Sequence, residues 1–376
     1  MRYSMSRPSK SKIFPVLFII VALSGILWIF YDSFYGPVTG EHENEVNTIL
    51  VGSKDAVFEP VLPEDPVVLP EDFKEHPEFQ HEWWHFFANV QDENDEHYAI
   101  QWSFFRIASD EREMGGWQSP QTYLSHVVIT SNQTSIKEQR VARGGIGQAG
   151  VQETPFGVWI DNWRWSTTSK APFPSALNIE TDEFKVNLYN TAIGPYVMNG
   201  DLGYQIKHDL LPVASFSVAA PFIRTKGELV LGGKTYRVKG EAWFNKEWGS
   251  GLLAEGQQGW DQFSLRLTDG RTLMVNQYRH VRQPSYTFGT IADRKGEVII
   301  LKGEDVDIVS TGIVKLRNGR KLPLQWVINV PKYNIHLTTR AMKAEQWLPF
   351  AIPYWEGPIV ATGSHDAVGL MQLTGY

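Results

Sequence analysis

The stretch GWDQFSLRLTDGRTLMVNQYR, residues 259–279, alternates apolar and polar side chains on both sides of the dipeptide Asp269-Gly270. Alternation with a period of two is typical of a half-buried strand, and Asp-Gly is a common hairpin turn. The stretch therefore predicts a strand, a tight turn and a return strand. Similar runs, separated by turn signals such as Gly232-Gly233, continue from residue 79 to the end. Long amphipathic helical patterns are scarce, so the sequence predicts an all-β barrel or sandwich.

A related pattern occurs earlier, in EWWHFFANVQDENDEHYAIQWSFFR (residues 82–106), where a longer acidic turn separates two similar runs. Five residues recur in the same order: Trp84, Phe87, Asp92, Gln101 and Arg106 correspond to Trp260, Phe263, Asp269, Gln277 and Arg279. Such an echo indicates an internal duplication, although aromatic-rich β segments also match by coincidence. Duplication fits the chain length and predicts two barrel-like domains, residues 68–225 and 226–376.

The start of the chain has a different character. Residues 1–12 are basic and contain no acid, and residues 13–31 carry no charge over a length that can cross a bilayer. We predict a single-pass signal anchor in the inner (cytoplasmic) membrane, with residues 1–12 in the cytoplasm and the bulk of the chain in the periplasm. No small-residue cleavage site follows the run, so a cleaved signal peptide is the less favoured alternative. The acidic, Pro-rich residues 32–67 are interpreted as a spacer.

Composition excludes several classes of protein. The 376 residues are 42% hydrophobic, which is enough for one large or two ordinary cores. The net charge of -7 is concentrated in the spacer, and the remaining body is close to neutral without a basic stripe, so we predict no nucleic-acid partner. The absence of cysteine excludes disulfides, a thiol nucleophile and a lipoprotein anchor. No G-x-S-x-G, phosphate loop or dinucleotide fingerprint is present, and we predict no cofactor.

The stretch HEWWH, residues 81–85, has the spacing of the zinc-protease motif H-E-x-x-H. On a helix His81 and His85 would lie one turn apart and could bind one zinc ion. On a strand the two residues are roughly 13 Å apart and cannot share a metal without a bend. Helical spacing is also present around this stretch, so periodicity alone leaves both readings open. The strand-like echo near Trp260 favours the strand.

Several longer motifs help to decide between the zinc-site and strand interpretations of HEWWH. LPEDFKEHPEFQHEWWHFFANV, VKGEAWFNKEWGSGLL, QQGWDQFSLRLTDGRTLMVNQYR and YWEGPIVATGSHDAVGLMQLTGY occur in this order between about Leu69 and Tyr376. This series resembles the lipocalin-like family that contains the AttH proteins and the bacterial CrtC-type carotenoid hydratases. In that family the first motif resembles E-W-W-Y, so His85 stands where tyrosine is usual. The resemblance therefore argues against a zinc protease, and we predict no metal site.

The resemblance implies two consecutive lipocalin-like β-barrels, an apolar cavity, and ligands of isoprenoid, polyketide or lipid type. Some members hydrate a carbon–carbon double bond, some related fungal proteins shape cycloadditions, and many are only presumed hydrolases. Hydration of an alkene needs a strong acid, such as a carboxylic acid kept protonated by an apolar pocket. In the hydratases the proposed acid is the aspartate of a W-x-D-x-E-W motif, and Asn245 stands at this position here.

Other groups are candidates for the acid. In a strand, Asn245 and Glu247 share one face, with Lys246 on the other. Glu247 could replace the missing aspartate, or it could form a structural ion pair with Lys246 or Arg279. Asn245 could hold a ligand by hydrogen bonds without chemistry. We also retain Asp261, from the family's G-W-D-W motif, as a candidate catalytic residue. The terminal motif usually carries a glutamate where this chain has Gln372, so acids and phenols have been exchanged for neutral groups at several positions.

The sequence thus predicts a protein that binds an apolar small molecule. An enzyme of the hydratase, isomerase or hydrolase type is the alternative, and a subunit beside a membrane transporter complex is a third. Aromatic residues can pack the barrel cores equally well. The candidate ligand-binding residues are Trp83, Trp84, His85, Trp243, Trp248, Trp260, Gln277, Tyr354 and Glu356, with Trp355 beside them.

Overall fold

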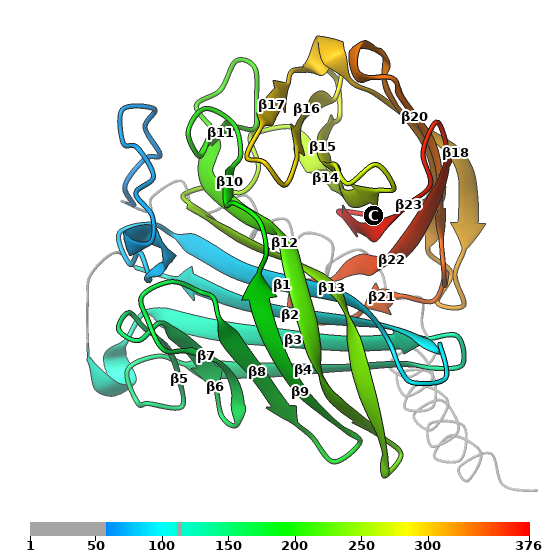
Figure 1. Ribbon diagram of the computed structural model, residues 1–376. Coiled ribbons are helices and arrows are strands. Elements are labelled where there is room, and N and C mark those ends of the chain that lie inside the picture. The colour runs from blue at the N-terminus through cyan, green and yellow to red at the C-terminus, as the bar shows by residue number, and fades with distance from the viewer. Residues whose placement is uncertain (1–57, 111–114) are drawn as a thin grey trace, which may run out of the picture. The chain divides into compact units, whose positions relative to one another are not determined.

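The computed structural model describes residues 58–110 and 115–376. The predicted cytoplasmic segment (1–12), the predicted membrane span (13–31) and most of the predicted spacer (32–67) lie outside the described residues. Within the described ranges, none of the helices has the length and hydrophobicity that crossing a membrane would require. The described chain is all-β and forms two barrel-like sheets (Figure 1).

The first sheet has thirteen strands in the described part of the chain, in the order β4-β3-β2-β1-β13-β12-β9-β8-β7-β6-β5, with β10 and β11 paired to β12. Its strands are β1 (His81–Gln91), β2 (His97–Ala108), β3 (Gln121–Ser131), β4 (Ser135–Arg143), β5 (Ala149–Gln152), β6 (Gly157–Ile160), β7 (Trp163–Thr167), β8 (Ser175–Glu180), β9 (Phe184–Ala192), β10 (Val197–Met198), β11 (Tyr204–Ile206), β12 (Ala214–Leu231) and β13 (Lys234–Gly249).

The second sheet has ten strands among the described residues, in the order β17-β16-β15-β14-β23-β22-β20-β19-β18, with β21 paired to β22. Its strands are β14 (Gln257–Leu267), β15 (Thr272–His280), β16 (Tyr286–Ala292), β17 (Val298–Leu301), β18 (Asp307–Lys315), β19 (Lys321–Val330), β20 (Ile335–Ala341), β21 (Trp347–Leu348), β22 (Tyr354–Gly363) and β23 (Ala367–Thr374). Short 3-10 helices are η2 (Glu71–Phe73), η3 (Gly116–Gln118), η4 (Gly303–Asp305) and η5 (Pro331–Tyr333).

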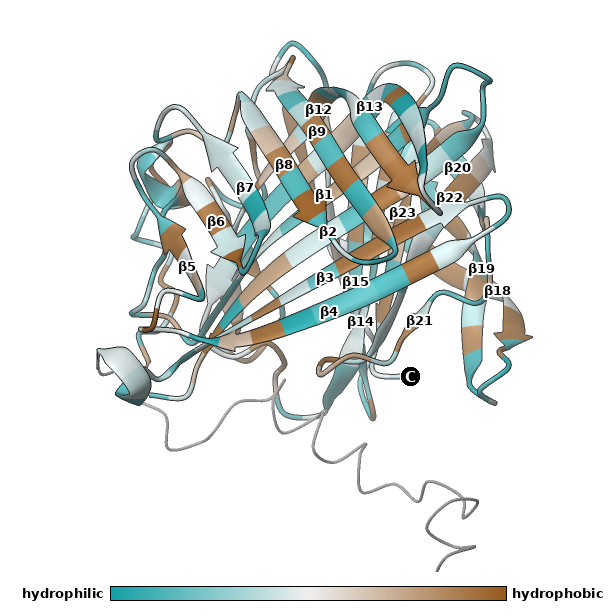
Figure 2. Cartoon of the chain, turned by 90° about the horizontal axis from the view of Figure 1, so that it is seen from below, coloured by the Kyte–Doolittle hydropathy of each residue, from teal (hydrophilic) through white to brown (hydrophobic). Residues whose placement is uncertain are grey.

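Each sheet curves around a hydrophobic core of its own. In the first, alternate residues of β1 point inward, so that Phe86 packs against Trp165 from β7 and Trp84 against Phe104 from β2. The aromatic rings of Trp102 and Trp165 stack at 5.5 Å between centroids. The core of the second sheet is mainly aliphatic, with Phe263 packed against Trp326. The edge strand β4 is hydrophilic over most of its length (Figure 2), as expected of an edge that must not pair with another chain.

The predicted hairpin is present as β14 and β15, closed by a turn in which Gly270 has a φ of +91°. HEWWH opens β1, a strand, which confirms that reading of the motif. The echoed stretches form the first hairpin of each sheet, β1–β2 and β14–β15. Equivalent residues do not face the same way, however: Trp84 points into the first core, whereas Trp260 lies at a cavity between the sheets.

Two of the predicted boundaries are corrected by the structure. Residue 225 lies inside β12, and the first sheet continues through β13 to Gly249, because β13 pairs with both β12 and β1. The change from one sheet to the other thus falls between Gly249 and Gln257. The predicted spacer also ends too late, since Val67 is buried in the first core and Val61 packs against it.

The outer faces of β1, β2 and β13 pack against β14, β22 and β23 of the second sheet. Phe87 and Ala99 from the first sheet form one buried cluster with Leu370 from the second. Trp243 and Met274 belong to another cluster that also spans the two sheets. The side chains that point away from the two cores therefore meet in the seam between the sheets, and two cavities lie there.

Candidate functional site

The first cavity lies in the seam between β1, β2 and β13 on one side and β14, β22 and β23 on the other. Its volume is about 50 Å³, so that it holds one or two water molecules. The wall is mainly apolar, with a few polar groups that converge on it. It is lined by His81, Glu82, Trp83, His85, Ser103, Phe105, Arg106, Ile107, Asn245, Leu252, Trp260, Gln262, Ser264, Ile352, Tyr354, Glu356, Leu370, Gln372 and Thr374.

A buried carboxylate, Glu356 on β22, is the charged centre of this wall. Gln101 on β2 donates a hydrogen bond to Glu356 Oε2 over 2.7 Å, and Gln372 on β23 donates to Oε1 over 3.2 Å. His85 Nε2 lies 3.1 Å from Oε1, at ion-pair distance. Burial would raise the pKa of Glu356, but His85 and the hydrogen bond from Gln101 outweigh burial and hold that pKa below its ordinary value. Glu356 is thus kept ionised.

Gln372 connects Glu356 to the aromatic wall. Its amide oxygen accepts a hydrogen bond of 2.8 Å from Trp260 Nε1, and its amide nitrogen donates to Glu356. An amide suits this position because it can accept and donate at once. A glutamate at position 372, which the sequence resemblance implies, would put a second carboxyl beside Glu356, and two adjacent carboxyls share one proton. With Gln372 at this position, Glu356 is the one carboxyl of the pair of positions, and it is ionised. Two glutamates would instead share a proton.

Asn245 carries an acceptor that no described residue satisfies. Its side chain is 5% exposed and lines the cavity opposite His85, its register partner on β1. Asn245 Oδ1 is buried and has no hydrogen-bond partner among residues 58–110 and 115–376. Buried acceptors are almost always paired, because leaving one unpaired costs about 1–3 kcal/mol. Because Asn245 lines the cavity, a bound molecule that reaches Oδ1 would supply the missing hydrogen-bond donor.

Tyr354 lines the cavity and forms a neutral pair with His126, which lies outside the lining. The Gln139 side-chain oxygen accepts from the backbone N–H of Ala351, which fixes the orientation of its amide, and lies 3.2 Å from His126 Nε2. Nε2 therefore carries the proton, and Nδ1 accepts from the Tyr354 hydroxyl over 2.8 Å. Burial lowers the pKa of His126 to about 4, although Glu356 opposes this. Burial raises the pKa of Tyr354 well above its ordinary value, so Tyr354 also stays neutral.

The lowered pKa of His126 predicts acid sensitivity. Between its folded value of about 4 and the unfolded value of 6.5, the unfolded chain binds more protons. The contribution of His126 to stability is therefore fully present above pH 6.5 and is lost as the pH falls to about 4. We expect a loss of about 3 kcal/mol over this range. Denaturant unfolding at pH 7 and pH 4.5 measures it, and His126→Gln should reduce the difference; an equal difference in both proteins would contradict the assignment.

The structure brings together six of the predicted site residues around the first cavity: Trp83, His85, Asn245, Trp260, Tyr354 and Glu356. Trp84 and Trp248 instead face the first barrel core, and Trp355 is buried in the second. Trp243 lines the second cavity. Gln277 pairs in register with Asp261 on β14, outside the lining of either cavity.

The two remaining candidate acids are held in ion pairs outside the cavity lining. Glu247 contacts the ammonium of Lys207, and Ser215 donates to it over 2.7 Å. The predicted ion pair is thus present, but with Lys207 in place of Lys246 or Arg279. Asp261 lies 3.2 Å from Arg279 Nε, and burial raises its pKa to about 6 against the effect of that arginine.

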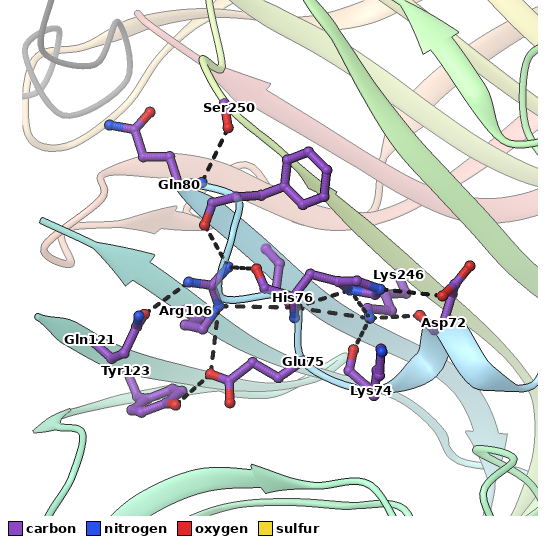
Figure 3. Close-up of polar contacts among 12 residues, drawn as sticks. Asp72, Lys74, Glu75, His76, Gln80, Arg106, Gln121, Tyr123, Lys246 and Ser250 are labelled. Atoms are coloured by element: carbon purple, nitrogen blue, oxygen red, sulfur yellow. Dashed lines mark hydrogen bonds and ion pairs between the residues drawn. The ribbon is translucent and has the colours of Figure 1, made fainter. Parts of the chain in front are cut away.

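A second buried polar cluster joins the segment 72–80 to β2 and β13 of the first sheet (Figure 3). Lys246 on β13 donates to the backbone oxygens of Asp72 and Lys74 and to His76 Nδ1, so all three of its protons are used. Arg106 on β2 donates to the backbone oxygens of His76 and Phe79, over 2.6 and 2.8 Å. These two cations attach the segment 72–80 to the barrel.

Glu82 is the countercharge of both cations. Its carboxylate lies 3.9 Å from Lys246 Nζ and from Arg106 Nε, and it accepts the backbone N–H of His76 over 2.9 Å. Burial would raise the pKa of Glu82, but Lys246 and Arg106 lower it to about 2. Burial lowers the pKa of Lys246 to about 8 despite the attraction of Glu82. All three protons of Lys246 are donated to groups of the chain, so the main role of the cluster is to hold structure, although Arg106 Nε has no hydrogen-bond partner among the described residues.

Among the polar residues of the site that the sequence does not single out are Gln101, His126 and Gln262. Gln101 belongs to the echo, but nothing in the sequence connects it to Glu356. Gln262 ends the stretch that resembles the G-W-D-W motif, and His126 stands in a strand without a motif. Period-two alternation along β2 places Gln101, Ser103 and Phe105 on one face, but that signal becomes useful only when the partner face is known.

Comparisons with known proteins cover nearly all of the described chain. The sequence profile described as AttH-like matches residues 60–376. No curated protein gave a match. A putative AttH protein from Nitrosomonas europaea superposes with a TM-score of 0.77 at 24% identity, over 85% of this chain and 99% of that one. Kievitone hydratase from Nectria haematococca gives a TM-score of 0.64 at 14% identity, over 87% and 98%. At these identities the likeness of structure shows the fold alone.

Proposed function

The chain belongs to the AttH-like family, and on that premise we propose that it binds a small, mainly apolar molecule with a hydrogen-bond donor in the first cavity. We place this binding on the periplasmic side of the inner membrane, where the sequence predicts the body to lie. The unpaired Asn245 Oδ1 supports the proposal most directly, because Asn245 lines the cavity and a donor on the ligand would satisfy this buried acceptor.

The aromatic wall supports an apolar ligand of lipid or isoprenoid type. Trp83, Phe105 and Trp260 present ring surfaces to the cavity, while the converging polar groups would fix the orientation of one polar end. A cavity of about 50 Å³ is smaller than such a ligand. Binding therefore includes displacement of lining side chains, and the half-buried Trp83 and Trp260 are the residues we expect to turn aside.

Geraniol and its methyl ether test the donor requirement, because they differ only in the O–H group. We expect the full-length protein to bind geraniol about tenfold more tightly, as one hydrogen bond to a buried acceptor contributes on the order of 1 kcal/mol. In Asn245→Leu the two ligands should bind equally, as measured by titration calorimetry. Asn190→Leu is the matched control, because Asn190 also has a buried, unpaired Oδ1 but lies on β9. Equal binding of both ligands to the unaltered protein would overturn the proposal.

A second function, acid–base chemistry on the bound molecule, is favoured by one observation. Glu356 and His85 lie 3.1 Å apart at the cavity wall, so a proton can pass between a ligand and this pair. The structure keeps Glu356 ionised, which suits a general base better than the strong acid that alkene hydration needs. Product analysis distinguishes the two functions, because a binding protein returns geraniol unchanged.

A further inference from the structure

The second cavity lies further along the same seam and is much larger, with a volume of about 450 Å³. This volume is within the range of roughly 300–1,000 Å³ that is typical of small-molecule sites. Phe87 on β1, Trp243 on β13 and Ile359 on β22 contribute to its apolar wall. Each of these side chains is buried. The cavity is therefore built to receive an apolar chain.

Cations dominate the charged part of the lining, which contains Lys239, Arg266, Lys343 and a single carboxylate, Glu241. Glu241 is already neutralised, because Arg266 and Arg294 contact it at 2.6 and 2.8 Å. Lys239 and Lys343 have no hydrogen-bond or ion-pair partner in the described ranges. Burial lowers the pKa of the half-buried Lys343. An anionic group at this rim would therefore meet two ammonium groups that have no other countercharge.

A small apolar contact separates the two cavities. Phe87 lines the second cavity and Leu370 lines the first, and the two belong to one buried cluster with Ala99. Ser264 lines both cavities. An apolar tail that enters from the cationic rim would thus end against Phe87, and this residue would limit the length of the tail.

We infer that the second cavity binds an anionic amphiphile, with its acidic head at Lys239 and Lys343 and its single apolar tail against the wall that the cross-strand neighbours Trp243 and Phe87 form. The inference does not depend on the function proposed for the first cavity. The two sites differ in their chemistry, because the first presents an uncharged acceptor and a carboxylate, whereas the second presents unpaired cations.

Three ligands with the same ten-carbon tail test the head-group preference: decanoate, decanol and decyltrimethylammonium. We expect the full-length protein to bind decanoate at least fivefold more tightly than decanol, and the cation most weakly. Raising the salt concentration from 20 to 500 mM should reduce the preference for decanoate, because exposed charges are screened. Titration calorimetry measures each affinity. Equal affinities for decanoate and decanol at low salt would overturn the inference.

Substitutions of lining residues test whether decanoate binds in the second cavity. Lys239→Gln and Lys343→Gln should each weaken decanoate about two- to fivefold, as expected for partly exposed ion pairs, without changing decanol. Lys321→Gln is the control, since Lys321 is exposed on β19.

Phe87→Ala should increase the affinity for hexadecanoate relative to the affinity for decanoate, because it removes the side chain at the end of the cavity. Unchanged decanoate binding in the double lysine variant would place the site elsewhere. Asn245→Leu should leave decanoate binding unaltered, which distinguishes this site from the first cavity.

Discussion

Replacing Lys246 with methionine is expected to lower the free energy of unfolding by about 3–5 kcal/mol, because it leaves a buried carboxylate without its main countercharge. Lys246 and Glu82 are both fully buried. The substitution also removes the donor to the backbone oxygens of Asp72 and Lys74, and each unsatisfied buried acceptor costs about 1–3 kcal/mol. The segment 72–80 would lose one of the two cations that attach it to the barrel. Denaturant unfolding of the full-length chain at pH 7 measures the change.

The pH dependence of this variant separates loss of the charge pair from loss of packing. In the unaltered protein Glu82 has a folded pKa of about 2 against 4.5 unfolded, so its contribution is present above pH 4.5 and is lost as the pH falls towards 2. Without Lys246, burial should raise the folded pKa of Glu82 relative to that of the unaltered protein. Protonation would then relieve the unpaired charge, and the variant should recover part of its deficit as the pH falls from 7 to 5.

Lys239→Met is the matched control, because Lys239 lies on the same strand but is exposed. Its effect on stability should stay within about 0.5 kcal/mol. The double variant Lys246→Met with Glu82→Gln should lose less than Lys246→Met alone, because the unpaired negative charge of Glu82 is then absent, while Arg106 keeps Glu75 as a countercharge at 3.6 Å. A deficit below 1 kcal/mol in Lys246→Met, or a deficit that grows on acidification to pH 5, would contradict the assignment of Lys246 as the countercharge of Glu82.

Period-two alternation made part of this arrangement predictable. It separates Lys246 from Asn245 and Glu247 on β13, and these residues do face opposite sides of the sheet. Alternation cannot say which face meets the barrel core and which meets the second sheet, because both faces are largely buried. For that reason Trp84 and Trp248 were predicted to lie near the ligand, although they pack in the first core.

Contacts between distant parts of the chain were beyond sequence reasoning. His85 and Glu356 come from β1 and β22, and Gln101 from β2, so their meeting depends on how the two sheets dock. The boundary near residue 225 was wrong for a related reason. β12 continues past Pro221 through a bulge between Ala220 and Ile223, and a turn or a domain boundary cannot be distinguished from such a bulge by local composition.

Replacing Glu356 with methionine is expected to cost about 3–5 kcal/mol of stability, because hydrogen bonds to a buried charge contribute about 1.5–3 kcal/mol each. The substitution orphans the donors of Gln101 and Gln372, which come from different sheets, so it also weakens the docking of the sheets. Glu356→Gln keeps an acceptor at the same position and should lose about half as much. Glu304→Met, at an exposed site in η4, is the control and should be neutral within about 0.5 kcal/mol.

Glu356→Gln also distinguishes the two proposed functions, because it preserves the shape of the cavity and removes the base. If the protein only binds its ligand, the affinity for geraniol should change by less than about threefold and geraniol should remain unconverted in both proteins. If the Glu356 and His85 pair transfers protons, geraniol should be converted by the unaltered protein, and conversion should fall by at least about 100-fold in the variant. Conversion at an undiminished rate would exclude Glu356 as the base and leave Glu247 and Asp261, which lie outside the cavity lining, as the remaining candidates.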